Sequence, residues 1–260
     1  MQHIEYEIKD YVGVFTIDRP PVNALNSDLV AEIGQAAGQV ERDGQAGVVR
    51  CVIITSRGKY FSAGADLKER QGMDNVTWRK QHEIFEEALD LIGHFPMPII
   101  AAVNGAVMGG GCELAAFGDM VIATPKAKFG LPEIKLLGTF PPFATSIFPY
   151  LVGPKRAMEL LLTGDPITAE EALQLRLVNK VVPEADLNKT LDQLLAQIAQ
   201  HSAPVLSMTK RALYEGLGMS LPDSMKHSRD LFLNELYKLE DSQEGLRAVI
   251  EKRKPQWKNR

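Results

Sequence analysis

Two glutamates in apolar surroundings are the residues of this chain best placed to do chemistry. Glu113 follows three consecutive glycines, Gly109–Gly111, and stands directly before an apolar run at residues 114–117. Glu133 lies further along, in the segment KFGLPEIKLLG, and also has apolar neighbours. An ionised carboxylate is costly in apolar surroundings unless it is paired, protonated or used. Two such groups close together could act as a general acid and a general base.

Two segments rich in small residues could supply backbone hydrogen-bond donors to the same place. Gly109–Gly111 lie at an expected helix start, where unpaired amides suit a phosphate or a developing oxyanion. The segment KYFSAGADLKE, residues 59–69, follows an expected strand, where loops commonly carry function. Each signal is weak alone: a tight turn, an ordinary polar loop and a solvated Glu133 are equally good or better interpretations. Together they predict an acid/base pair beside an oxyanion hole.

The elements that must position these residues alternate between strands and helices. Residues 4–17 predict an antiparallel strand pair with a turn near Lys9–Asp10. Residues 27–42 have the apolar spacing of a helix, with Ser27 as a possible N-cap. Further along we expect strands at 48–56, 98–103 and 120–124 and helices at 77–95 and 110–117. This alternation predicts parallel strands joined by right-handed crossovers.

After residue 140 the pattern becomes mainly helical. Thr168 and Glu171 fit a capping box. Only 177–183 has the pattern of a strand, and helices are expected at about 142–151, 154–162, 168–175, 184–200, 203–218, 220–239 and 242–253. The sequence therefore predicts an α/β core at residues 1–195 and a helical region at 196–260.

Composition limits the classes of function. The 260 residues are 45% hydrophobic and carry a net charge of −4, without the broad basic face that nucleic acid requires. Cys51 and Cys112 do not form a disulfide framework, and the five histidines are scattered, so we expect no metal site. The N-terminus is no signal peptide, and the longest apolar stretch is too interrupted to span a membrane. We therefore expect a cytoplasmic protein without a membrane span.

The motifs resemble those of the enoyl-CoA hydratase/isomerase (crotonase) superfamily over essentially the whole chain. They are PVNALN (21–26), FSAGADLKE (61–69), PIIAAVNGAVMGGGCELAAFGDMVIAT (98–124), FGLPEI (129–134), GPKRAMELLLTGDPITAEEAL (153–173) and EGLRAVIEKRKP (244–255). The resemblance implies an α/β fold, a spiral of ββα units with a helical C-terminal region. It also implies that residues 196–260 serve trimerisation, giving a homotrimer or a hexamer built from two trimers.

The resemblance further implies an acyl-CoA substrate and a role in fatty acid metabolism such as β-oxidation. The backbone amides of Ala65 and Gly110 match the oxyanion hole. Glu113 matches the residue that activates water, and Glu133 the residue that delivers a proton to the substrate. No separate cofactor is implied, because coenzyme A is part of the substrate.

The same resemblance assigns residues to substrate binding. Coenzyme A would contact Val22, Ala24, Ala63, Asp66, Leu67, Lys68 and, near the C-terminus, Lys252; an aromatic position of the family is Val249 here. The acyl pocket departs from the common glycine-rich pattern, because KLLGTFPPFATSIFPYLVG places Pro141, Pro142 and Phe143 there. Stiffer residues at this point predict a short acyl chain or a flat ring.

Other functions remain open on the sequence alone. Two carboxylates could also shuttle a proton between carbons, as in an enoyl-CoA isomerase, or serve a specialised hydratase of cyclic or branched substrates. RNA binding is a more remote alternative, because the helix expected at 77–95 is mixed and acidic rather than lysine-rich. An inactive family member is equally remote, since neither glutamate is missing.

Overall fold

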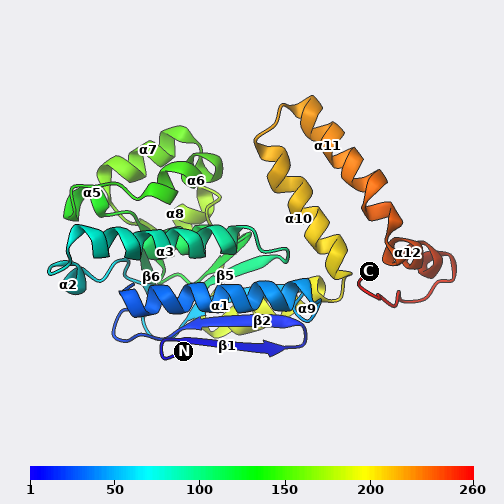
Figure 1. Ribbon diagram of the computed structural model, residues 1–260, viewed down its shortest axis with the longest axis horizontal. Helices are drawn as coiled ribbons and strands as arrows, with labels where there is room; N and C mark the ends of the chain where they lie inside the picture. Colours follow the sequence, from blue (N-terminus) through cyan, green and yellow to red (C-terminus); the bar gives the residue numbers. More distant parts are fainter.

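A computed structural model describes residues 1–260 and places two β-sheets at the centre of the fold (Figure 1). The larger sheet has the strand order β1-β2-β3-β5-β7-β10, in which only β1 and β2 are antiparallel. Its strands are β1 Ile4–Lys9, β2 Val12–Ile17, β3 Cys51–Ser56, β5 Ile99–Val103, β7 Met120–Ala123 and β10 Lys180–Val181. The smaller sheet has the order β4-β6-β8-β9, with strands Tyr60–Ser62, Ala106–Met108, Lys128–Gly130 and Ile167–Thr168.

The chain alternates regularly between the two sheets. A strand of the larger sheet is followed by one of the smaller sheet and then by a helix: β3 and β4 precede α2 and α3, β5 and β6 precede α4, and β7 and β8 precede α5. Neighbouring strands from successive units are parallel, as such crossovers require. This is the spiral of ββα units that the resemblance implied, so the predicted fold is confirmed.

Two long helices cover one face of the larger sheet. Helices α1 (Ser27–Gln45) and α3 (Asn75–Gly93) run side by side in Figure 1 and bury the apolar stripe that their spacing predicts. The N-cap of α1 is Asn26, whose side chain accepts a hydrogen bond from Leu29 N at 3.0 Å. The expectation that Ser27 is the N-cap is therefore wrong, because Ser27 is already the first helical residue.

The remaining helices complete the core and form a separate C-terminal arm. Helix α9 packs its apolar residues against the other face of the larger sheet, while α10, α11 and α12 extend away from both sheets (Figure 1). A partly buried ion pair between Lys210 Nζ and Asp119 Oδ2, at 2.9 Å, ties α10 to the core. The division of the chain at residue 195 stays a prediction.

The helices other than α1 and α3 are α2 Leu67–Arg70, α4 Gly110–Ala116, α5 Glu133–Leu136, α6 Pro142–Val152, α7 Pro154–Thr163, α8 Ala169–Gln174, α9 Leu187–Ala199, α10 Ala203–Leu217, α11 Leu221–Asn234 and α12 Glu240–Ile250, with 3₁₀ turns at Glu184–Asp186 and Leu236–Lys238.

The sequence pattern misses the short elements. None of the smaller sheet was expected, since strands of two or three residues are too short to show alternation. The strand expected at 177–183 is only Lys180–Val181, and the helix expected at 220–239 ends at Asn234. The first hairpin and the capping box at Thr168 are confirmed. No helix is at once long and apolar enough to cross a membrane.

Candidate active site

A cavity of about 280 Å³ lies between the segments that follow strands β4, β6 and β8. It contains both glutamates and both backbone positions singled out by the sequence. Its walls come from the loop before α1, from the segment 63–70, from α3, from the start of α4 and from the segment 132–142. Its lining includes Ala65, Arg70, Trp78, Gly110, Glu113 and Glu133.

Glu113 lies in α4 and points at the first turn of α6. Its side chain is buried, with 3% of the residue's surface exposed. Its Oε1 atom accepts hydrogen bonds from Phe143 N and Ala144 N, each at 2.9 Å. These amides belong to the first turn of a helix and have no partner within it, so Glu113 caps the helix from a distance.

The two amides leave the second oxygen of Glu113 available to a ligand. The pKa of Glu113 is raised from the usual 4.5 to about 7, mainly by burial and also by the charge of Glu133, while the amides of Ala144 and Phe143 oppose the rise. A carboxyl with a pKa near neutrality can both accept and release a proton at physiological pH.

Glu133 is the first residue of α5, directly after strand β8 and Pro132. Burial raises its pKa, partly offset by its own backbone amide and by the charge of Arg70. Its Oε2 atom is buried and has no hydrogen-bond partner in the protein. Its Oε1 atom lies so close to Gly109 that a Cβ added there would stand 2.5 Å away. Glu133 therefore lines the cavity and carries a buried oxygen without a hydrogen-bond partner.

The backbone amides of Ala65 and Gly110 are both free to donate. Leu25 N donates to Gly64 O and Asp66 N donates to Leu25 O, which leaves Ala65 N without a protein acceptor. Gly110 is the first residue of α4, and no side chain caps this helix. Gly109 precedes it with φ +52° and ψ −129°, a conformation that only glycine adopts readily.

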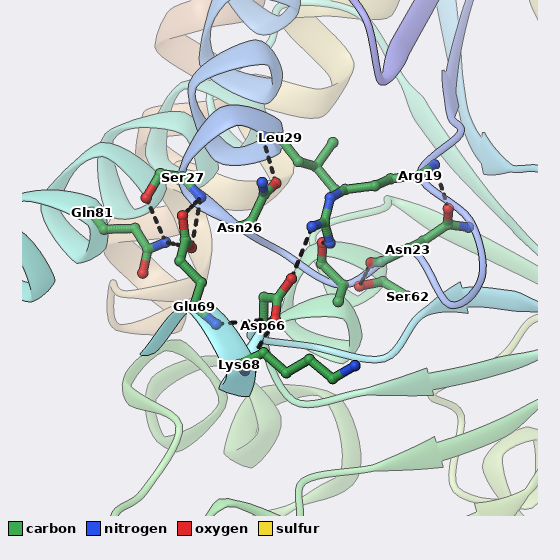
Figure 2. Close-up of polar contacts among 11 residues, drawn as sticks. Arg19, Asn23, Asn26, Ser27, Leu29, Ser62, Asp66, Lys68, Glu69 and Gln81 are labelled. Atoms are coloured by element: carbon green, nitrogen blue, oxygen red, sulfur yellow. Dashed lines mark hydrogen bonds and ion pairs between the residues drawn. The ribbon is translucent and has the colours of Figure 1, made fainter. Parts of the chain in front are cut away.

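A network of polar contacts holds the segment that carries Ala65 (Figure 2). Asp66 caps α2 through the amides of Lys68 and Glu69 and pairs with Arg19 Nη2 at 2.9 Å. Glu69 accepts from Ser27 N at 3.0 Å and from Gln81 Nε2 at 2.8 Å. The segment is thus fastened to the first turn of α1 and to α3, so the position of the Ala65 amide is fixed from several sides.

The structure does not bring every predicted binding residue to the cavity. Ala63 and Leu67 line it, as do Pro141 and Pro142. Phe143 contributes its amide, while its ring packs edge-on against Phe85 and Phe117.

The other predicted coenzyme A contacts lie outside the lining. Val22 and Ala24 offer backbone carbonyls to Ala63 N and to Arg19, and the Lys68 side chain makes no hydrogen bond. Lys252 follows α12 on the distant arm and is exposed, so this chain does not place it at the cavity, and its role stays a prediction.

Sequence reasoning missed the wall formed by α2 and α3. Trp78, His82 and Phe85 line the cavity from one face of α3, and their spacing of four and three residues along a helix could have revealed this face. Arg70, at the end of α2, also lines the cavity, and its guanidinium lies 5.2 Å from the centre of the Trp78 ring. A four-residue helix leaves no periodic signal, so the position of Arg70 was not predictable.

Comparison with known proteins places this arrangement in a family. The sequence model described as enoyl-CoA hydratase/isomerase matches residues 7–260. A Bacillus subtilis protein named probable enoyl-CoA hydratase is 40% identical over 99% of each chain, and a Clostridium acetobutylicum short-chain-enoyl-CoA hydratase is 36% identical over 100% of this chain and 99% of its own. The crystal structure of an enoyl-CoA hydratase from Bacillus anthracis matches with a TM-score of 0.93 and 32% identity over 100% of both chains. This chain is therefore an enzyme of the enoyl-CoA hydratase/isomerase family and has the crotonase fold.

Proposed function

We propose that this enzyme adds water across the 2,3 double bond of a 2-enoyl-CoA thioester. The observation that carries the proposal is the meeting of Glu113, Glu133 and two free amides in one cavity. The names of the Bacillus and Clostridium relatives support the same reaction.

The amides of Ala65 and Gly110 would bind the thioester oxygen. Negative charge grows on this oxygen when a nucleophile adds to the conjugated double bond. Donors fixed in advance stabilise that charge without reorganising, and one such donor typically contributes about 3–4 kcal/mol. The polar network around Asp66 and Glu69 supplies the rigidity that this requires.

Glu113 would act as the base and Glu133 as the acid. Water bound to the free oxygen of Glu113 loses a proton to it as the water oxygen bonds to the β-carbon. Glu133 then delivers its own proton to the α-carbon, which consumes the enolate. The mechanism requires Glu113 ionised and Glu133 protonated when substrate is bound, and the amides of Phe143 and Ala144 favour the anion at Glu113.

The test is loss of the absorbance of crotonyl-CoA in the wild type and in Glu113→Gln and Glu133→Gln. Each variant is expected to lower kcat by roughly 10²- to 10⁴-fold, the usual contribution of a positioned proton-transfer group. Glu87→Gln, an exposed change of the same type on α3, is the control and is expected to retain activity. Activity that survives in either cavity variant would overturn the assigned roles.

The cavity supports a compact acyl group. Pro141 and Pro142 stiffen its wall, and the volume of about 280 Å³ lies just below the usual range for small-molecule sites. The enzyme is therefore expected to prefer a short chain or a flat ring. Comparable kcat/KM values for chains from C4 to C16 would contradict this preference.

Isomerisation of a 3-enoyl-CoA is the second candidate, because Glu133 presents an unpartnered oxygen that could also accept a proton from the α-carbon. Appearance of conjugated-thioester absorbance from 3-hexenoyl-CoA would support it. A rate far above that of hydration would make isomerisation the main activity.

A further inference from the structure

Arg70 brings a positive charge into the cavity without a partner. Its guanidinium forms no ion pair or hydrogen bond with a protein group, although the residue is partly buried and lines the cavity. The guanidinium lies over the face of the Trp78 ring, 5.2 Å from the ring centre. Stacking of this kind leaves the N–H edges of a guanidinium free to bind an acceptor.

The guanidinium is held in place from both sides. The Arg70 backbone amide donates to Asp66 O at 3.0 Å, and α2 is fastened through Glu69 to the start of α1 (Figure 2). On the other side the Trp78 ring stacks on His82, with ring centres 5.6 Å apart and planes 9° apart. Guanidinium, indole and imidazole thus form a layered wall that presents the donors of Arg70 in a defined position.

In the proposed mechanism the substrate complex lacks the negative charge of Glu133, which otherwise compensates Arg70. Burial lowers the pKa of Arg70, and the negative charge of Glu133 opposes this change. When Glu133 carries the proton that it donates in the proposed mechanism, that compensation disappears. A partly buried cation without a counter-charge is costly, so an anion supplied by the substrate would restore the balance.

We propose that Arg70 binds a carboxylate at the far end of the acyl group, which makes the preferred substrate the coenzyme A monothioester of a short unsaturated dicarboxylic acid. A planar guanidinium matches a carboxylate through two parallel hydrogen bonds. This inference rests on the proposed hydratase function, because that function makes the cavity the acyl site. It adds a substrate class that a purely apolar pocket would reject.

The first experiment compares binding of two acyl-CoA thioesters that cannot react. Glutaryl-CoA and hexanoyl-CoA have acyl groups of the same length, and only glutaryl-CoA ends in a carboxylate. The ratio of their Kd values is measured by calorimetry for wild type, Arg70→Gln and Arg70→Lys. Effects common to both ligands, such as those on the coenzyme A part, cancel in this ratio.

The wild type is expected to bind glutaryl-CoA more tightly, and Arg70→Gln to reduce its preference roughly 10- to 100-fold, the usual range for a hydrogen bond to a charged group. Arg70→Lys is expected to show a preference between those of wild type and Arg70→Gln, since lysine keeps the positive charge but lacks the paired N–H donors of a guanidinium. Arg79→Gln, an exposed change on α3, is the matched control. Equal ratios in wild type and Arg70→Gln would overturn the proposal and leave Arg70 only an electrostatic role towards Glu133.

Turnover then separates this inference from the function on which it rests. Hydration of glutaconyl-CoA, of 2-hexenoyl-CoA and of crotonyl-CoA is followed for the same proteins. A wild type that prefers glutaconyl-CoA, with the preference lost in Arg70→Gln, supports the inference. Crotonyl-CoA hydration combined with an unchanged selectivity overturns it and retains the hydratase function, whereas turnover of none of the three overturns the hydratase function itself.

Discussion

At the scale of single residues, Glu113 is subject to two opposing influences. Burial in the cavity wall raises its pKa to about 7, while the amides of Phe143 and Ala144 stabilise its anion. The outcome is a carboxylate that is ionised at mildly alkaline pH and still able to take up a proton. Such a base is suited to removing a proton from water under physiological conditions.

The raised pKa predicts a pH-dependent stability effect. The folded state favours protonated Glu113, so this stabilisation is complete below the unfolded pKa near 4.5 and is lost as the pH rises through about 7. Glu113→Gln does not titrate and keeps an acceptor for the two amides. Relative to wild type, its free energy of unfolding is expected to gain up to about 3 kcal/mol between pH 4.5 and pH 8.5.

Urea unfolding at the two pH values measures this gain. Glu87→Gln, on the exposed side of α3, serves as the control and is expected to follow the wild type at both. A constant difference between Glu113→Gln and wild type would show that folding does not raise the pKa of Glu113.

The same pKa predicts the acidic limb of the rate profile. Because the proposed base must be ionised, kcat/KM for crotonyl-CoA is expected to rise tenfold per pH unit well below 7, and to fall again at higher pH where the proposed acid Glu133 loses its proton. Initial rates from pH 5 to pH 9 give the profile. A curve without an inflection near 7 would show that Glu113 does not act as the base in the free enzyme.

Among the elements, the turn between β6 and α4 depends on a glycine at position 109 for two separate reasons. Its positive φ directs the next amide into the cavity, and the missing Cβ leaves space for the Glu133 carboxylate. Gly109→Ala is therefore expected to lower kcat by at least about 100-fold, through a displaced acid and a misplaced donor. It is also expected to destabilise the fold by roughly 1–3 kcal/mol.

Gly47→Ala is the matched control for this change. Gly47 also has a positive φ, of +71°, but a Cβ there would meet nothing within 4 Å. It is expected to lose stability without losing activity, as judged by thermal unfolding and crotonyl-CoA turnover. Equal activity losses in the two variants would show that backbone strain alone, and not contact with Glu133, explains the effect at Gly109.

The elements also show how far the sequence alone could reach. Helices α1 and α3 were predictable because each spans 19 residues with a periodic apolar stripe. The meeting of Glu113 and Glu133 was predictable because each follows a recognisable strand of the larger sheet, β5 or β7, although β6 and β8, which stand between them and the glutamates, were too short to recognise. The amides that hold Glu113 and the stacking of Arg70 on Trp78 depend on tertiary packing, which no local pattern encodes.

Across the whole molecule, the C-terminal arm of α10, α11 and α12 stands out because it carries apolar side chains on its surface. On α11, Leu221, Met225 and Phe232 are 74%, 66% and 52% exposed and recur on one helical face. We propose that this face contributes to a homotrimer, alone or paired as a hexamer, in agreement with the resemblance.

The proposed assembly can be tested through mass. The double variant Met225→Glu and Phe232→Glu is expected to reduce the molar mass in solution to that of the single chain, measured by light scattering after size exclusion. Lys226→Glu, an exposed change about 100° round α11 from Met225, is the control and is expected to keep the wild-type mass. A wild type with the mass of one chain would contradict the proposal.

The fastening of the segment that carries Ala65 has a consequence for behaviour on heating. Glu69 ties this segment to the same two helices, α1 and α3, that cover the sheet and bury much of the core (Figure 1). Local opening of the segment therefore requires breaking contacts that belong to the global fold. The catalytic site and the scaffold are expected to fail at one temperature, so the midpoint of thermal inactivation coincides with the midpoint of unfolding instead of preceding it.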